Sequence, residues 1–231
     1  FIVASFVVFF YIHDFHHTLK KPRPGAKGVL YAVPSKMQPG LNVMTTYIDN
    51  NGCNVFDDGG KILSRFPGRF CKFIPRMGLL TSFSNKISLL DSHLNPIWQH
   101  EAEEIHHDVT VSIPRGEIFY LDTRLHAKTH FCEDILVGLK FSGEEIFRMS
   151  ITDLLPAMKR ITGGRHDSTP VLSNHNCYLD PTHTNSVDVV PPGFEERGVF
   201  YKPGNILLSV SEQSILIILD RKSGKIVWSY H

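Results

Sequence analysis

Short apolar runs, separated by turn-forming residues, follow one another along most of the chain. The runs are rich in Val, Ile, Phe, Tyr and Leu, which β-strands favour, and apolar residues seldom recur with the helical period. They predict strands at 28–33, 44–48, 61–63, 78–82, 86–90, 108–113, 117–121, 134–140, 206–210, 215–219 and 225–228. The pattern therefore predicts an all-β domain.

Two kinds of turn recur between these runs. Turns of the first kind contain glycine, which supplies the positive φ of a tight hairpin, and precede a strand at 57–60, 114–117 and 203–205. In the second kind, a strand ending in Asp leads through a short turn to a strand carrying Trp, at 89–98 and 219–228, with a looser copy at 141–147. Repeated hairpins of two kinds are typical of a β-propeller, and a β-sandwich is the alternative.

The length of the repeat sets the number of blades. A propeller blade is a four-stranded sheet of about 40–50 residues. Residues 28–231 therefore correspond to about four to five blades.

One segment departs from this pattern of short strands. Residues 149–160 favour a helix, with Ser150 or Thr152 as the N-cap and Pro156 near the start. The stretch 161–178 is rich in Gly, Ser, Asn and His and predicts an irregular loop.

The first residues of the chain form a separate region. Residues 1–12 are almost wholly apolar, although a helix that spans a bilayer needs about 20 such residues. Lys20, Lys21, Arg23 and Lys27 follow. We interpret residues 1–27 as the end of a membrane anchor with a basic linker, and residues 28–231 as the propeller domain. A buried strand or core helix is the alternative interpretation of the apolar run.

Composition and charge limit the class of protein and the partners that it can have. Hydrophobic residues make up 42% of the chain and charged residues 20%, which is typical of a globular domain. The formal net charge of +1 argues against a nucleic-acid partner, which usually needs a clearly basic face. The four cysteines contain no C-x-x-C motif. A Cys53–Cys71 or a Cys132–Cys177 disulfide can form in an oxidising compartment, and free buried thiols are an equal alternative.

Histidines mark the candidate site. His106, His107 and Asp108 come just before one strand, and His183 and Asn185 just before another. The innermost strand of each propeller blade faces the central channel, so we expect these side chains to converge there from different blades. Such a group suits a bound oxyanion, a nucleophile or general acid, or a metal site. Hydrogen bonding between blades is the purely structural alternative.

Four segments resemble the nucleotide-independent arylsulfotransferase family in order and spacing: 105–118, 180–187, 202–210 and 219–228. The family patterns are HHD before a strand, H-x-N-S, a Pro-Gly turn before L-x-S, and an Asp turn before K-V-V-W. The resemblance implies a six-bladed propeller. It also implies transfer of a sulfuryl group from a phenolic sulfate ester to a phenol, through a channel histidine and without a cofactor. By motif match His106, His107, His183 and Asn185 would bind the sulfate.

The sequence departs from the family pattern at two places. Ser211 stands where the family has an arginine, and losing a fixed cation would lower the rate about 10²–10³-fold. The family's nucleophilic histidine lies one blade beyond the Trp228 strand, so we expect it beyond His231 and expect the propeller to be incomplete here. The alternative function is therefore an inactive family member that serves as a binding or structural subunit of a membrane assembly. A third, weaker interpretation is a metal-binding propeller that uses His106, His107, Asp108 and His183.

The expected partners and location follow from this resemblance. An active protein would bind an aryl sulfate and a phenol, and the N-terminal segment would contact the membrane. Protein partners in a membrane complex, or further copies of the chain, are also expected. The family implies an extracytoplasmic propeller, periplasmic or lumenal. The basic residues between Lys20 and Lys27 instead favour the cytoplasmic side.

Overall fold

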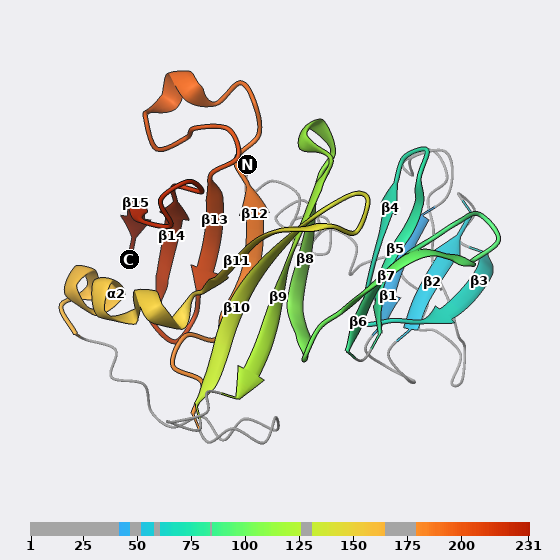
Figure 1. Ribbon diagram of the computed structural model, residues 1–231, viewed down its shortest axis with the longest axis horizontal. Coiled ribbons are helices and arrows are strands. Elements are labelled where there is room, and N and C mark those ends of the chain that lie inside the picture. The colour runs from blue at the N-terminus through green and yellow to red at the C-terminus, as the bar shows by residue number, and fades with distance from the viewer. Residues whose placement is uncertain (1–41, 47–51, 58–60, 84, 126–130, 165–178) are drawn as a thin grey trace, which may run out of the picture. The chain divides into compact units, whose positions relative to one another are not determined.

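The computed structural model describes residues 42–46, 52–57, 61–83, 85–125, 131–164 and 179–231 (Figure 1). The chain divides into two compact units, one formed by Phe1–Met44 with Asn54–Phe66 and the other by Thr45–Cys53 with Pro67–His231. A three-stranded sheet has the order β1 (Asn42–Thr46), β2 (Gly52–Phe56) and β3 (Ile62–Pro67).

The second unit contains three consecutive four-stranded antiparallel sheets, in each of which the spatial order of the strands is their order in the chain. The first sheet has β4 (Phe70–Ile74), β5 (Gly78–Phe83), β6 (Lys86–Leu90) and β7 (Pro96–Glu101). The second has β8 (Ile105–Ser112), β9 (Glu117–Leu125), β10 (Cys132–Lys140) and β11 (Glu145–Ser150). The third has β12 (Thr184–Val189), β13 (Ile206–Val210), β14 (Ile215–Leu219) and β15 (Ile226–Tyr230). Consecutive up-and-down sheets of this kind are propeller blades rather than the Greek-key sheets of most sandwiches.

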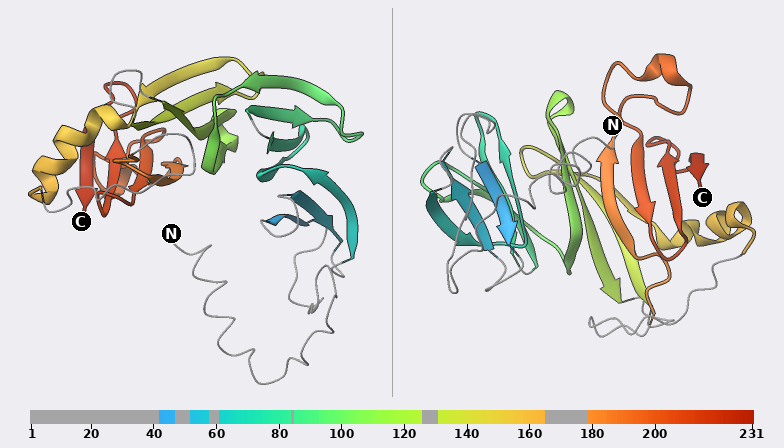
Figure 2. Two further views of the ribbon diagram at one scale, coloured as in Figure 1. Left: turned by 90° about the horizontal axis from the view of Figure 1, so that it is seen from below. Right: turned by 180° about the vertical axis from the view of Figure 1, so that it is seen from behind.

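The sheet β8–β11 lies between the other two, as Figure 2 shows. Alternate residues of a strand point to opposite faces of its sheet. Phe119 and Leu121 of β9 accordingly pack toward β13 and β14, whereas Ile118 and Tyr120 belong to the core shared with β5 and β6. Burying each such side chain contributes about 1.5–3 kcal/mol, which explains why the central parts of β9 (118–121) and β10 (135–139) are apolar.

The aromatic residue of the second turn type connects neighbouring sheets. Trp98 of β7 donates a hydrogen bond from Nε1 to the carbonyl oxygen of Phe141, at 2.8 Å, in the turn between β10 and β11. The indole ring also lies against Gly143, where a Cβ atom would come within 2.9 Å of it. In the last sheet Trp228 stacks on Phe200 instead. The repeated tryptophan is therefore a packing residue on the outer strand of its sheet.

The helix begins later than the sequence predicted. Met149 and Ser150 still belong to β11, and a 3-10 turn, Thr152–Leu154, precedes the helix α2 (Leu155–Thr162). Ser150 Oγ does accept the backbone N–H of Asp153, at 3.2 Å, as a capping residue would. The prediction of a helix from 149 was wrong because that stretch completes the edge of the second sheet. Of the predicted loop 161–178, residues 165–178 lie outside the described part of the chain.

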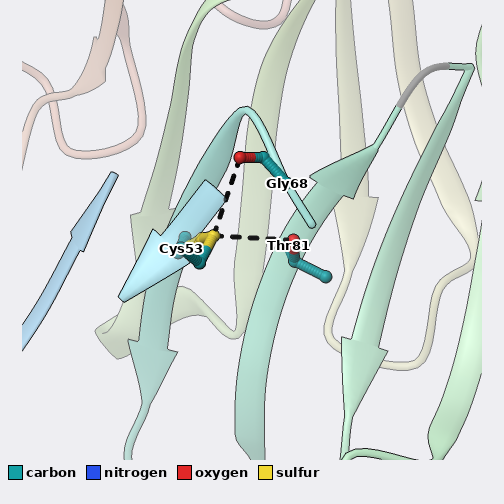
Figure 3. The surroundings of a disulfide bond; sticks show 4 residues. Cys53, Gly68 and Thr81 are labelled. Atoms are coloured by element: carbon teal, nitrogen blue, oxygen red, sulfur yellow. Dashed lines mark hydrogen bonds between the residues drawn. A yellow bond between two sulfur atoms is a disulfide. The ribbon is translucent and has the colours of Figure 1, made fainter. Parts of the chain in front are cut away.

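A disulfide joins Cys53 of β2 to Cys71 of β4, with their Cα atoms 6.0 Å apart (Figure 3). The sulfur of Cys53 is fully buried and lies 3.9 Å from both the carbonyl oxygen of Gly68 and Oγ1 of Thr81. Cys132 is disulfide-bonded as well, and Cys177, its predicted partner, lies outside the described residues. The disulfide alternative of the sequence analysis thus holds for Cys53, Cys71 and Cys132.

Two N-terminal predictions cannot be followed in the structure, because residues 1–12 and the predicted strand at 28–33 both lie outside the described residues. No helix within the described ranges is long and apolar enough to cross a membrane.

Candidate functional site

The first strands of the three sheets meet at Asp108. Its Oδ2 accepts the backbone N–H of Val187 on β12, at 3.2 Å, and its Oδ1 lies 3.8 Å from Nζ of Lys72 on β4. A second bond joins β8 and β12 directly, because Oγ1 of Thr110 donates to Oδ1 of Asp188 at 3.3 Å. The aspartate of the HHD motif therefore links three sheets.

Both strands that carry the candidate histidines are bulged at the motif. The pairing of β8 with β9 passes from His106↔Leu121 directly to Val109↔Tyr120, which leaves His107 and Asp108 unpaired. The pairing of β12 with β13 skips Asn185 in the same way. A bulge bends its strand and redirects side chains, and bulges are common beside active sites.

Two of the histidines have a left-handed backbone, with φ of 52° at His107 and 43° at His183. For a residue other than glycine this conformation costs about 1–3 kcal/mol. It persists only where the surrounding structure holds it in place, and such residues cluster at functional sites. The same strained backbone in two neighbouring sheets therefore marks this region as the candidate site.

The structure brings the three predicted histidines together. The ring centroids of His106 and His107 are 5.0 Å apart, and those of His107 and His183 are 4.7 Å apart, both with edge-to-face geometry. His106 is buried, whereas the side chain of His183 is 33% exposed. Asn185 is exposed on the bulge of β12. His107, the middle ring of this row, is exposed, so the row joins one buried imidazole to two that solvent reaches.

Asp134 of β10, which was not among the predicted site residues, lies behind the row and is fully buried. Its Oδ1 is 3.3 Å from Nε2 of His106, an ion-pair distance without the alignment of a hydrogen bond. Its Oδ2 accepts Oγ1 of Thr182 and the backbone N–H of Thr184, both at 2.7 Å. The sequence signal for Asp134 was a charged residue directly before the apolar run 135–139, because a charge that is buried with such a run must find a partner.

His106 and Asp134 hold each other in the charged form. Burial, the largest single influence, lowers the pKa of His106, but the carboxylates of Asp134, Asp180 and Asp122 together outweigh it and raise that pKa above its ordinary value. For Asp134, burial raises the pKa, while His106, Thr184 and Thr182 outweigh it and lower that pKa. The interior end of the row is therefore a buried ion pair.

We expect this pair to make stability depend on pH. Since the pKa of His106 is raised on folding, its contribution is complete below the ordinary value of 6.5 and is lost as pH rises through the raised value. Since the pKa of Asp134 is lowered, its contribution is complete above 3.8 and is lost as pH falls through the lowered value. The pair should stabilise most between about pH 4 and 6.5. Urea midpoints measured from pH 5 to 9 should fall more steeply for the wild type than for His106→Gln, and equal slopes would contradict the assignment.

His183 is held differently, by an aspartate three residues earlier. Its backbone N–H donates to Oδ1 of Asp180 at 2.8 Å, and its ring Nδ1 lies 2.6 Å from Oδ2. A carboxylate oxygen only accepts, so Nδ1 carries the proton. The backbone N–H and Oγ of Ser211 both donate to the carbonyl oxygen of His183, at 3.2 and 3.1 Å. Ser211 therefore fixes the backbone of the histidine.

The metal interpretation finds no support in this geometry. Within the described ranges, no group of three or more His, Cys, Asp or Glu side chains is arranged to hold a metal ion. Asp108, one of the four predicted ligands, directs its oxygens at Val187 and Lys72 instead.

A cavity of about 600 Å³ lies away from the histidines, between β11 and the turn that joins β14 to β15. Three arginines line it, and each is paired with a glutamate: Arg124 with Glu133, Arg148 with Glu145 and Arg221 with Glu117. An anion in this cavity would have to compete with carboxylates already in place. The histidine row is therefore the better candidate site.

Comparison with known proteins bears on the fold. No family model matches the sequence, and no curated protein matches it at a significant level. The chain is similar to a solved structure from Bacteroides caccae, a protein of unknown function, with 12% identity and a TM-score of 0.51 over 82% of this chain and 57% of that one. It is also similar to the WD40 domain of Neurospora crassa Pan2 (12% identity, TM-score 0.49, 84% and 47% covered). Kluyveromyces lactis Hsv2 is a further match, with 9% identity and a TM-score of 0.41 over 84% of this chain and 49% of that one.

The chain spans about half the length of these solved structures. At such identities the similarity concerns the fold alone. The described residues themselves show an all-β, propeller-like chain of four-stranded antiparallel sheets whose first strands come together.

Proposed function

We propose that this chain is part of an arylsulfotransferase-like propeller, which transfers a sulfuryl group from a phenolic sulfate ester to a phenolic acceptor. One observation carries the proposal. Histidines from the first strands of two sheets, at the positions of the family motifs, form one row whose inner end is a buried ion pair. A scaffold that only packs sheets together has no need of strained, partly exposed histidines at this place.

The row suits the chemistry of sulfuryl transfer. In a loose transition state, negative charge spreads over the oxygens of the transferred group, and catalysis comes from positioning and charge stabilisation. Imidazole N–H groups of His106, His107 and His183, and the amide of Asn185, would donate to those oxygens. Lys72 adds positive charge beside Asp108. No cofactor enters this mechanism.

The cysteines support an extracytoplasmic location. Cys53–Cys71 is a disulfide, and Cys132 is disulfide-bonded as well. Disulfides form and persist in oxidising compartments and are rare in the cytosol. The proposal therefore places the propeller in the periplasm or a lumen, with the N-terminal segment at the membrane.

Ser211 favours a second candidate function, an inactive family member that serves as a binding or structural subunit. Its N–H and Oγ are both directed at His183, so this position supplies no cation to a sulfate ester. The histidine row would then bind an anionic ligand without transferring it. Turnover of an aryl sulfate distinguishes the sulfotransferase from the inactive binding subunit.

The test is turnover of 4-nitrophenyl sulfate with phenol as the acceptor, by the full-length native protein. We expect release of 4-nitrophenolate with equal formation of phenyl sulfate, and we expect His107→Ala to lower kcat/KM about 10²-fold because an oxyanion donor is lost. His93→Asn, an exposed histidine in the turn after β6, is the control and should match the wild type. No release by a folded protein would overturn the transferase and leave the binding subunit.

A further inference from the structure

We propose that Asp134 is a positioning residue for His183, the histidine that the third sheet contributes to the row. Asp134 is fully buried and lies outside the segments that resemble the family motifs. It acts on the residues on either side of His183, Thr182 and Thr184, and so sets the place of that imidazole relative to the histidines of the second sheet. The proposal rests on the proposed function and deepens it.

One oxygen of Asp134 holds the chain on both sides of His183. Its Oδ2 accepts Oγ1 of Thr182 and the backbone N–H of Thr184, both at 2.7 Å. Because these donors flank one residue and meet at one acceptor, the chain has to turn around that acceptor at the residue between them. His183 accordingly has a left-handed backbone, which persists only where the surrounding structure imposes it.

Asp134 is itself fixed to the second sheet. It belongs to β10, and its carbonyl oxygen accepts the backbone N–H of Ile151 at 2.8 Å. Its other carboxylate oxygen, Oδ1, faces Nε2 of His106 at 3.3 Å. Although burial raises the pKa of Asp134, the contacts with His106, Thr184 and Thr182 hold that pKa below its ordinary value, so the ionised carboxylate can accept at both oxygens. One carboxylate therefore contacts residues of both sheets that supply the row.

Other bonds of this segment attach it to its own sheet. The backbone N–H and Oγ of Ser211 donate to the carbonyl oxygen of His183, and Gln213 donates to that of Pro181 at 2.9 Å. Ser211 and Gln213 lie in the turn between β13 and β14, so these bonds fix His183 within the third sheet. The row combines rings from two sheets, so its geometry also depends on bonds that cross between them. The bonds to Asp134 cross at His183.

The spacing of the rings is what these bonds protect. The ring centroids of His107 and His183 are 4.7 Å apart, a spacing at which both rings can donate to one sulfate group. Catalysis of sulfuryl transfer comes from positioning and charge stabilisation, and a displacement of about 1 Å can cost about 10²-fold in rate. A residue that fixes one ring against the other therefore supports the reaction without touching the substrate.

Thr182→Val tests this role, because it removes the hydroxyl that donates to Asp134 and nearly keeps the shape of the side chain. The full-length native protein is assayed with 4-nitrophenyl sulfate and phenol. We expect kcat/KM to fall about 10-fold or more, with most of the loss in kcat, because the ring of His183 leaves the place that it needs in the transition state. Thr182→Ser keeps the hydroxyl and should recover most of the loss.

Thr110→Val is the matched control. Oγ1 of Thr110 donates to Oδ1 of Asp188 at 3.3 Å, so this bond also joins the second and third sheets, but it lies at the other end of β12 from His183. Thr110→Val should keep the kcat/KM of the wild type. Equal losses in Thr110→Val and Thr182→Val would overturn the proposal, because the general contact between the sheets would then explain them.

A second measurement does not depend on turnover. Histidine ring signals in ¹⁵N spectra show which ring nitrogen carries the proton, and those of His183 are the signals missing from His183→Gln. At alkaline pH the wild type should carry the proton on Nδ1, which lies 2.6 Å from Oδ2 of Asp180. Thr182 lies in the turn between Asp180 and His183, so Thr182→Val should relax this turn and populate the other tautomer. Thr110→Val should keep the wild-type signals.

The outcomes separate the role of Asp134 from the function on which it rests. Unchanged ring signals and an unchanged kcat/KM in Thr182→Val overturn the positioning role and leave the sulfotransferase in place. A folded wild type without turnover overturns the sulfotransferase. The positioning role then stands if the ring signals of His183 change in Thr182→Val and not in Thr110→Val, and it is wrong if they do not.

Discussion

Asp134→Ala is expected to lower the free energy of unfolding by about 3–5 kcal/mol, because it removes one partner of a buried charge. His106 would keep its place in the interior without the carboxylate 3.3 Å away. The hydroxyl of Thr182 and the backbone N–H of Thr184 would lose their acceptor as well. Each unsatisfied buried group adds about 1–3 kcal/mol, so the loss should be among the largest for any single substitution.

Urea unfolding at pH 6, where the pair is fully charged, measures this loss. The matched control is Glu101→Ala, which breaks the ion pair of Glu101 with Lys86 at the surface, where the N–O distance is 3.0 Å and both side chains are exposed. Exposed pairs contribute about 0–1 kcal/mol. If Asp134→Ala and Glu101→Ala lowered the free energy of unfolding by the same small amount, the pair of His106 and Asp134 would be as well solvated as a surface pair. That result would contradict its burial.

Gly78→Ala is the second substitution with a large expected effect. It should lower the free energy of unfolding by about 3 kcal/mol or more, because the strain of the backbone and the collision of the new Cβ atom add to each other. Gly78 begins β5 with φ of 143°, a conformation that L residues rarely adopt. A Cβ atom there would lie 1.9 Å from the carbonyl oxygen of Leu90 at the end of β6, and backbone cannot rotate away as a side chain can. The two strands would have to separate.

Thermal unfolding followed by circular dichroism tests this prediction against Gly163→Ala. Gly163 ends α2 with φ of 70°, and a Cβ atom there would meet nothing within 4 Å. Gly163→Ala should therefore lower the free energy of unfolding only by the strain of the left-handed backbone, about 1 kcal/mol. A melting temperature for Gly78→Ala equal to that of Gly163→Ala would mean that β5 and β6 are not as close as the structure places them.

The strands that the sequence predicted best are those with both faces buried. β6, β13 and β14 match their predicted bounds, because burial on two faces requires continuous apolar runs that stand out in the sequence. β11 was anticipated only through the looser turn copy at 141–147, because it is the edge strand of its sheet and lies partly in solvent, so that its polar residues resemble those of turns. β12 was anticipated only as a strand following the His183 motif, since its polar side chains and its bulge interrupt the alternation.

The candidate site was predictable where its residues are neighbours in the chain. His106, His107 and His183 were expected to converge because motifs at the starts of strands meet at the centre of a propeller, and their rings do lie together. Asp180 could have been found from its spacing, since an aspartate three residues before His183 can reach the backbone N–H of that residue. The contact of Asp134 with His106 and the bonds from Ser211 depend on how β10 and β13 are placed, which the sequence does not reveal.

The bulges of β8 and β12 have an evolutionary consequence. His107, Asp108 and Asn185 occupy positions that are already outside the ladder of paired residues. A residue inserted or deleted in a regular strand turns every following side chain to the opposite face. The same change at a bulge alters the length of an unpaired stretch and leaves the rest of the strand in register. A propeller-like chain of this kind can therefore acquire, move or discard residues at these bulges one at a time, while the sheets that carry them continue to fold.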